Sequence, residues 1–150
     1  MKKFKFTLQS LFNYKQTVEK MQKAELQKAR LALRELLEEE KRLLEAYAGN
    51  ERSLEKALIE NTDVAAALSE HDIYFTFLRD AIKEIRERIA RARELVAQCQ
   101  ERLLITMKEL KTYTKLRDEQ YQNYLKEVQA EEDKEIGDLV SFNTIIEEIS

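Results

Sequence analysis

The chain of 150 residues contains no proline, no tryptophan and only two glycines. Most turns and loops draw on proline and glycine, so a chain with so little of both has few turns. This shortage argues against β-sandwiches and doubly wound α/β folds, which need many turns. The length fits a single domain spanning residues 1–150.

Other features are missing as well. The longest apolar run, VAAAL at 64–68, is far shorter than the ~20 residues that span a bilayer, and the basic N-terminus lacks the apolar stretch of a secretory signal. The single cysteine, Cys99, cannot form an internal disulfide, which fits a reducing compartment. A net charge of −3 argues against nucleic-acid binding. We therefore expect a cytoplasmic protein with no nucleic-acid partner.

Charged residues make up 37% of the chain, and its second half carries a regular apolar repeat. Apolar or small residues alternate in steps of three and four at Phe75, Leu78, Ile82, Ile85, Ile89, Ala92, Val96, Cys99, Leu103, Thr106, Leu110 and Tyr113. A seven-residue repeat of this kind is typical of a helix in a left-handed coiled coil. It predicts a helix over about 73–135, with a looser repeat after Tyr113 and a short tail or helix over 137–150.

The first half predicts a second long helix, over about 8–60. Its stripe runs through Leu26, Ala29, Leu33, Leu36, Glu40, Leu43, Tyr47, Asn50 and Leu54. Upstream, Leu11, Tyr14, Val18 and Met21 keep the same steps, but joining them to Leu26 needs a one-residue adjustment.

Turn-prone residues separate the two predicted helices at Asn61-Thr62-Asp63. We expect a turn over about 61–72, with Ser69 or Asp72 capping the second helix. The chain then forms an all-α, antiparallel two-helix coiled-coil hairpin, in which residue i faces about residue 132 − i and Leu36 lies near Val96.

Charge supports this pairing. Residues 1–18 hold four lysines and no acid, whereas residues 127–150 hold eight acids and one lysine. A hairpin brings these opposite charges together, and a parallel dimer would stack like charges, although screened surface charges decide little alone. We expect a monomer, and a homodimeric rod is the alternative.

Little in the sequence suggests an enzyme. The only histidine, His71, reads as a polar residue of the turn, since a metal site needs about three ligands. Cys99 lies on the apolar stripe and reads as a buried thiol. The sequence has no glycine-rich phosphate loop and no catalytic motif. We expect no catalytic residue, no metal and no cofactor.

Several apolar residues lie off the stripes, near the expected ends of the hairpin. They are Phe4, Phe6, Leu44, Tyr74, Phe77, Tyr121, Leu125, Leu139, Phe142, Ile145, Ile146 and Ile149. Such residues either widen the helix contact locally or mark partner sites. Both readings remain open at this point.

Three segments resemble the FliJ family of flagellar export proteins. The opening KFKFTLQSL of residues 3–11 resembles the family's basic start with paired phenylalanines. Residues 74–82, YFTFLRDAI, resemble its mid-chain aromatic-x-x-x-Leu-x-x-Ala-Ile pattern, and residues 111–136 resemble its acidic C-terminal run. Gly137-Asp138 departs from the Asp-Glu with which the family often ends this run.

The resemblance implies a coiled coil similar to the central stalk of rotary ATPases. Such proteins occupy the pore of the hexameric export ATPase, FliI, and contact the export gate, FlhA, and export chaperones of the flagellar type III apparatus. The residues implied for the gate are Leu44, Tyr47, Tyr74, Leu78 and Ala81. Those implied for the ATPase are Phe4, Phe6, Leu8, Leu11, Glu132 and Asp138. A generic structural or chaperone-type coiled coil without an ATPase partner is the alternative.

Overall fold

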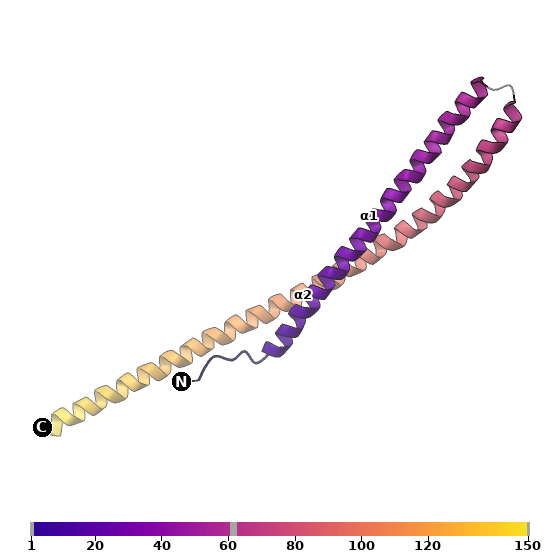
Figure 1. Cartoon of the computed structure of the whole chain (residues 1–150). Coiled ribbons are helices and arrows are strands. Elements are labelled where there is room, and N and C mark those ends of the chain that lie inside the picture. Colours follow the sequence, from indigo (N-terminus) through magenta and orange to yellow (C-terminus); the bar gives the residue numbers. More distant parts are fainter. Residues whose placement is uncertain (1, 61–62, 150) are drawn as a thin grey trace. The chain divides into compact units, whose positions relative to one another are not determined.

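The computed structural model describes residues 2–60 and 63–149 of the chain. The regular secondary structure in these ranges consists of two helices, α1 (Gln9–Glu60) and α2 (Val64–Ile149). The end of α1 contacts the beginning of α2, so the helices are antiparallel (Figure 1). The predicted all-α helical hairpin is confirmed.

The helices contribute to two compact units, which we describe separately. The loop unit consists of residues 21–103 and holds the helix ends that flank the turn. The terminal unit consists of residues 2–20 and 104–149, so it holds both the N-terminal segment and the C-terminal part of α2. The terminal unit therefore holds both the basic and the acidic end of the chain, and within it Lys2 lies beside Glu127 and Glu131.

The repeat read from the sequence forms the contact between the helices. All twelve positions predicted on α2, from Phe75 to Tyr113, are buried or half-buried, and so are all nine predicted on α1, from Leu26 to Leu54. In the loop unit, Leu26 and Ala29 form a buried cluster with Cys99. Cys99 is thus a core thiol, as expected.

The pairing of the two helices differs from the prediction by about one heptad. In the loop unit, Asn50 Nδ2 donates to the carbonyl of His71 at 3.2 Å, and in the terminal unit Lys15 pairs with Glu109. Residue i therefore faces about residue 124 − i, not 132 − i. The expected pair of Leu36 with Val96 is wrong, because Val96 packs against the cluster that contains Leu26.

The cause of this shift lies in the turn. α2 begins at Val64, so the expected turn over 61–72 is too long, and Asn61 and Thr62 lie outside the described residues. Asp63 caps α2, since its Oδ1 accepts a hydrogen bond from the Ala66 amide at 3.1 Å. The caps expected at Ser69 or Asp72 are wrong, and His71 lies inside α2 rather than in a turn.

The upstream stripe on α1 also differs. Tyr14 and Met21 are exposed, and the positions that face α2 are Phe12, Lys15, Glu19 and Gln22. These positions continue the steps of three and four from Leu26 without any adjustment. The apolar pattern was misleading because three of these positions are polar. One of them, Lys15, is stabilised by its ion pair with Glu109.

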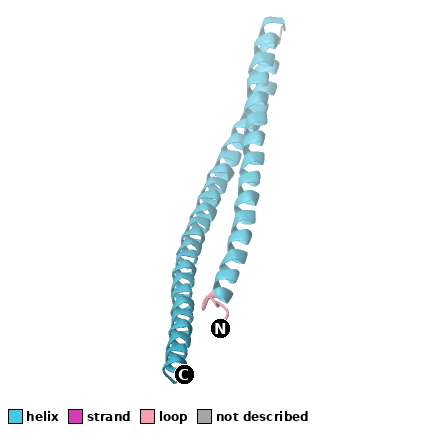
Figure 2. Ribbon diagram, turned by 90° about the vertical axis from the view of Figure 1, so that its left-hand side faces the viewer, coloured by secondary structure: helices cyan, strands magenta, loops and turns pink. Residues whose placement is uncertain are grey.

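The C-terminal part of α2 extends beyond the region covered by other described residues. Figure 2 shows α2 continuing as one helix past the N-terminal loop, and it ends at Ile149 rather than near 135. Gly137 does not interrupt it. Residues 129–149 are all exposed, a single helix of about 30 Å at 1.5 Å per residue.

Candidate functional site

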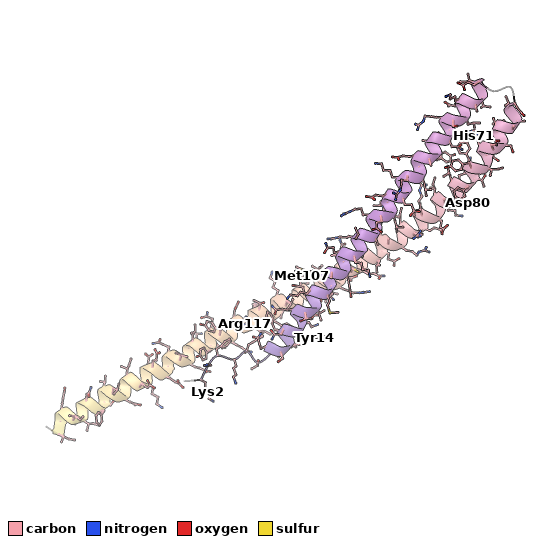
Figure 3. All side chains as sticks on the ribbon, in the orientation of Figure 1. Lys2, Tyr14, His71, Asp80, Met107 and Arg117 are labelled. Carbon is pink, nitrogen blue, oxygen red and sulfur yellow. The ribbon has the colours of Figure 1, made fainter. Side chains whose placement is uncertain are left out.

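The residues that the structure describes do not group into a metal site. Within residues 2–60 and 63–149, no three or more His, Cys, Asp or Glu side chains are placed to hold a metal ion. His71 is half-buried, and its ring nitrogens contact the Ala67 carbonyl at 2.7 Å and Ser53 Oγ at 3.3 Å (Figure 3). This histidine therefore ties the two helices together beside the turn. In the same ranges, neither helix offers a stretch apolar and long enough for a membrane span.

The residues expected to contact the gate all lie in the loop unit. Leu44 and Tyr74 are exposed, and Tyr47 and Ala81 are half-buried. Leu78 is only 1% exposed, so it belongs to the core and supports this surface from beneath. The structure thus brings the five residues into one unit but presents four of them to solvent.

A shallow groove of about 600 Å³ includes two of these residues, Leu44 and Tyr47, in its lining, and we call it the loop-unit groove. Its lining consists of Leu44, Tyr47, Arg79, Ile82, Lys83, Arg86, Glu87 and Ala90. Apolar side chains therefore combine with three cationic ones and one acidic one, so the cationic charge is in excess. This composition suits a partner segment that carries apolar and acidic side chains.

Aromatic and cationic groups hold the lining in place. The ring centroids of Tyr47 and Phe75 lie 4.8 Å apart, and the Arg79 guanidinium lies 5.9 Å from the Phe75 centroid. A hydrogen bond with Tyr47 raises the pKa of Arg79 above its ordinary value. Across the helices, Arg86 Nε lies 3.3 Å from Glu40 Oε2. Arg79 thus stays charged and positioned beside the groove.

Sequence reasoning missed the cationic side of this groove. Arg79, Lys83 and Arg86 look like ordinary members of a charged helix face. Their place beside Leu44 and Tyr47 depends on which residues of α1 face which residues of α2. With the expected pairing one heptad away, the sequence could not bring them together.

The residues expected to contact the ATPase all lie in the terminal unit, but they differ in accessibility. Phe6 is 6% exposed and forms a core cluster with Phe12 and Leu110, against which Phe4 and Leu8 pack half-buried. The exposed members of the expected set are Leu11, Glu132 and Asp138, and Phe4 and Leu8 are half-buried. The paired phenylalanines therefore serve first to widen the helix contact, one of the two readings that the sequence left open.

The N-terminal segment, residues 2–8, is fixed to α2 by both ring contacts and hydrogen bonds. Phe4 contacts Tyr121 at 5.1 Å and Tyr124 at 5.5 Å between ring centroids. The Tyr124 hydroxyl donates to the Lys2 carbonyl at 2.9 Å, and Gln120 Nε2 donates to Thr7 Oγ1 at 3.1 Å. Figure 3 shows Lys2 beside α2, on the segment that precedes α1.

The exposed end of α2 carries a further apolar face. Five large apolar residues recur there in helical steps, and all are exposed: Leu139, Phe142, Ile145, Ile146 and Ile149. Acidic residues precede this face and interrupt it. For these exposed residues the second interpretation from the sequence remains, namely that they form a surface that binds a partner.

The comparison with protein families decides the kind of protein. Residues 4–146 match the family model described as flagellar FliJ protein. The chain belongs to the FliJ family. It is therefore a protein related to flagellar export, as the three segments quoted above predict. A search of curated proteins found no match, and a search of solved structures found none either.

Proposed function

We propose that this FliJ-family chain is a stalk-like component of flagellar type III export. It binds the export ATPase hexamer, favours its assembled and active form, and links it to the export gate. The observation that carries the proposal is the family match over residues 4–146 of a helical hairpin. The separation of the two expected surfaces into different units supports it.

The terminal unit is the part proposed to enter the ATPase. It supplies the exposed end of α2, whose apolar face and acidic residues can insert into a ring lined by apolar and basic groups. Glu132 and Asp138 are the exposed acids of the expected set. The buried Phe6 and half-buried Phe4 act indirectly, by holding the N-terminal segment against α2.

The loop unit is the part proposed to contact the gate, through Leu44 and Tyr47 in the loop-unit groove and through Tyr74 and Ala81 elsewhere on the same unit. A gate segment with an apolar anchor and acidic side chains would complement the groove. Export chaperones are further proposed partners. The chain is proposed to act as a monomer in the cytoplasm, at the membrane only through its partners.

The physical basis of activation is linkage. A ligand that binds the assembled ring more tightly than the free subunits shifts the equilibrium toward the ring. The chain needs no catalytic group for this effect, because the ATPase performs the chemistry. The chain couples the ATPase to the gate if one molecule binds both partners simultaneously.

The test is the ATPase rate and oligomeric state of the purified export ATPase with and without this chain. We expect faster hydrolysis and more hexamer in its presence. Charge reversal of Glu132 and Asp138 to lysine should remove most of the effect, and the matched reversal of two exposed acids of the loop unit, Glu55 and Glu60, should not. An unchanged rate and an unchanged oligomer with the parent chain would refute the stalk role.

Gate binding has a separate test. Tyr47→Ala with Tyr74→Ala should weaken binding to the purified gate protein at least tenfold. Tyr14→Ala is the matched control, because Tyr14 is an exposed tyrosine of the terminal unit. Equal losses for the control and the double variant would contradict this assignment.

The alternative function is a structural or chaperone-type coiled coil with no ATPase partner. The exposed apolar residues of α2 suit any partner with an apolar surface, so they are also compatible with this alternative function. A chain that binds export chaperones or the gate but leaves the ATPase unchanged would establish this alternative.

A further inference from the structure

The N-terminal segment occupies one face of α2 in the terminal unit. We call this face the tyrosine face and define it by Gln120, Tyr121, Tyr124, Glu127, Val128 and Glu131. These residues share one side of the helix, since their spacing follows steps of three and four. We propose that the tyrosine face is a recognition surface for an extended partner segment with an aromatic residue flanked by lysines.

The bound N-terminal segment shows which chemistry the face accepts. The Phe4 ring meets Tyr121 edge-on, with an interplanar angle of 75°, and Tyr124 at 50°. The Tyr124 hydroxyl donates a hydrogen bond to a main-chain carbonyl, that of Lys2. The first contact selects an aromatic side chain. The second is available from any extended backbone, so the face does not require this particular sequence.

Charge supplies the second element of recognition. Lys2, Lys3 and Lys5 surround Phe4 and are exposed, and Lys2 lines a hollow of about 490 Å³ together with Glu127 and Glu131. Both carboxylates lie on α2, within an excess of acidic residues that continues along the helix. The tyrosine face is therefore complementary to a cationic segment and would repel an acidic one.

The first part of the N-terminal segment can leave this face without unfolding the terminal unit. Phe6 is anchored in the core cluster with Phe12 and Leu110, whereas Phe4 is only half-buried. Residues 2–5 are held by the Phe4 ring, which contacts Tyr121 and Tyr124 and packs on the outside of the core cluster, and by the hydrogen bond to the Lys2 carbonyl. A partner segment of the same chemistry can therefore replace residues 2–5 while Phe6 stays in place.

A fluorescently labelled peptide with the sequence of residues 2–8, KKFKFTL, tests the proposal on the full chain. Its affinity is compared for the parent, for Phe4→Ala, and for Phe4→Ala combined with Tyr124→Ala. In the parent chain the N-terminal segment occupies the tyrosine face and competes with the peptide. The Phe4→Ala substitution weakens this competition. We expect at least tenfold tighter binding by Phe4→Ala than by the parent, and loss of this gain in the double variant.

The controls separate recognition from non-specific attraction and from incorrect folding. A peptide whose first phenylalanine is replaced by alanine should not bind Phe4→Ala, and Phe77→Ala, which removes an exposed ring of the loop unit, should behave as the parent. Circular dichroism checks that all variants stay helical. Equal affinity for all chains, or no binding to Phe4→Ala, would overturn the proposal.

Exchange of N-terminal segments between two copies is the competing explanation for such a surface. Sedimentation of the parent chain at increasing concentration distinguishes it from a partner protein. A particle that stays at 17.8 kDa rules out a second copy as the occupant, which the partner proposal requires. A dimer that Tyr124→Ala abolishes would make a second copy the occupant and overturn the commitment to a partner.

Discussion

Leu78 offers a direct test of how the buried seam relates to the gate surface. It is 1% exposed, whereas its neighbour Phe77 is 63% exposed on the same helix. Truncating a buried leucine to alanine costs about 2–5 kcal/mol, because apolar contact is lost and a cavity remains. Leu78 lies between only two helices, which can close partly around the gap, so we expect the lower part of that range, about 2–3 kcal/mol.

Thermal unfolding followed by far-UV circular dichroism measures this cost. For a chain of this length, about 1 kcal/mol corresponds to a Tm shift of roughly 2–4 °C, so Leu78→Ala should lower Tm by roughly 5–10 °C. Phe77→Ala should change the free energy of unfolding by less than about 0.5 kcal/mol. Equal shifts for the two variants would refute the assignment of Leu78 to the core.

A second pair of variants, Leu78→Met and Tyr74→Ala, distinguishes a residue that supports the proposed gate surface from one that contacts the gate. If Leu78 acts from beneath the surface, Leu78→Met should retain gate binding, because it nearly conserves volume. Tyr74→Ala should lose affinity without a comparable loss of stability, since Tyr74 is exposed. A strong loss of gate binding in Leu78→Met at unchanged Tm would mean that the leucine touches the partner.

Three further changes have outcomes fixed by local chemistry. Asp63→Ala removes the cap of α2 and should cost about 1 kcal/mol of unfolding free energy in a denaturant titration. Gln22→Leu should stabilise the chain by about 1–2 kcal/mol, because the buried Gln22 Oε1 has no hydrogen-bond partner among the described residues; a lower Tm would contradict this. The hydrogen bond to Glu109 raises the pKa of Lys15 above 10.5, so the pair stabilises the fold below that pH and loses its effect as pH rises through the raised pKa. Lys15→Met should therefore lower Tm near neutral pH, and the difference from the parent should vanish in strong alkali; a difference independent of pH would exclude the ion pair as its cause.

Prediction from the sequence succeeded where most positions of the repeat are apolar. Between Phe75 and Tyr113 each position of the repeat is buried or half-buried, because the period of the pattern alone decides which side faces a partner helix. It failed between residues 11 and 21, where Tyr14 and Met21 looked like seam residues but are exposed. The polar side chain of Lys15 lies at the seam instead, and its pairing with Glu109 is a tertiary contact that no local pattern reveals.

The candidate sites likewise combine features that the sequence indicates with features that only tertiary contacts decide. The resemblance implies that Leu44, Tyr47 and Tyr74 contact the gate, which stays a prediction, and the structure shows Leu44 and Tyr74 exposed and Tyr47 half-buried in one unit. The sequence could not show that Leu78 is buried, nor that Phe6 is in the core. Whether a side chain is covered depends on what lies opposite it.

The sequence alone determined the two helices, the residues of their shared seam over 26–54 and 75–113, and the antiparallel direction, since each follows from local periodicity, turn-prone residues and the opposite charges of the chain ends. The tertiary structure decided the pairing of residue i with about residue 124 − i and the attachment of the N-terminal segment to α2. A heptad repeat looks the same after a shift of one heptad. Only the start of α2 at Val64, and the contacts that follow from it, select one pairing.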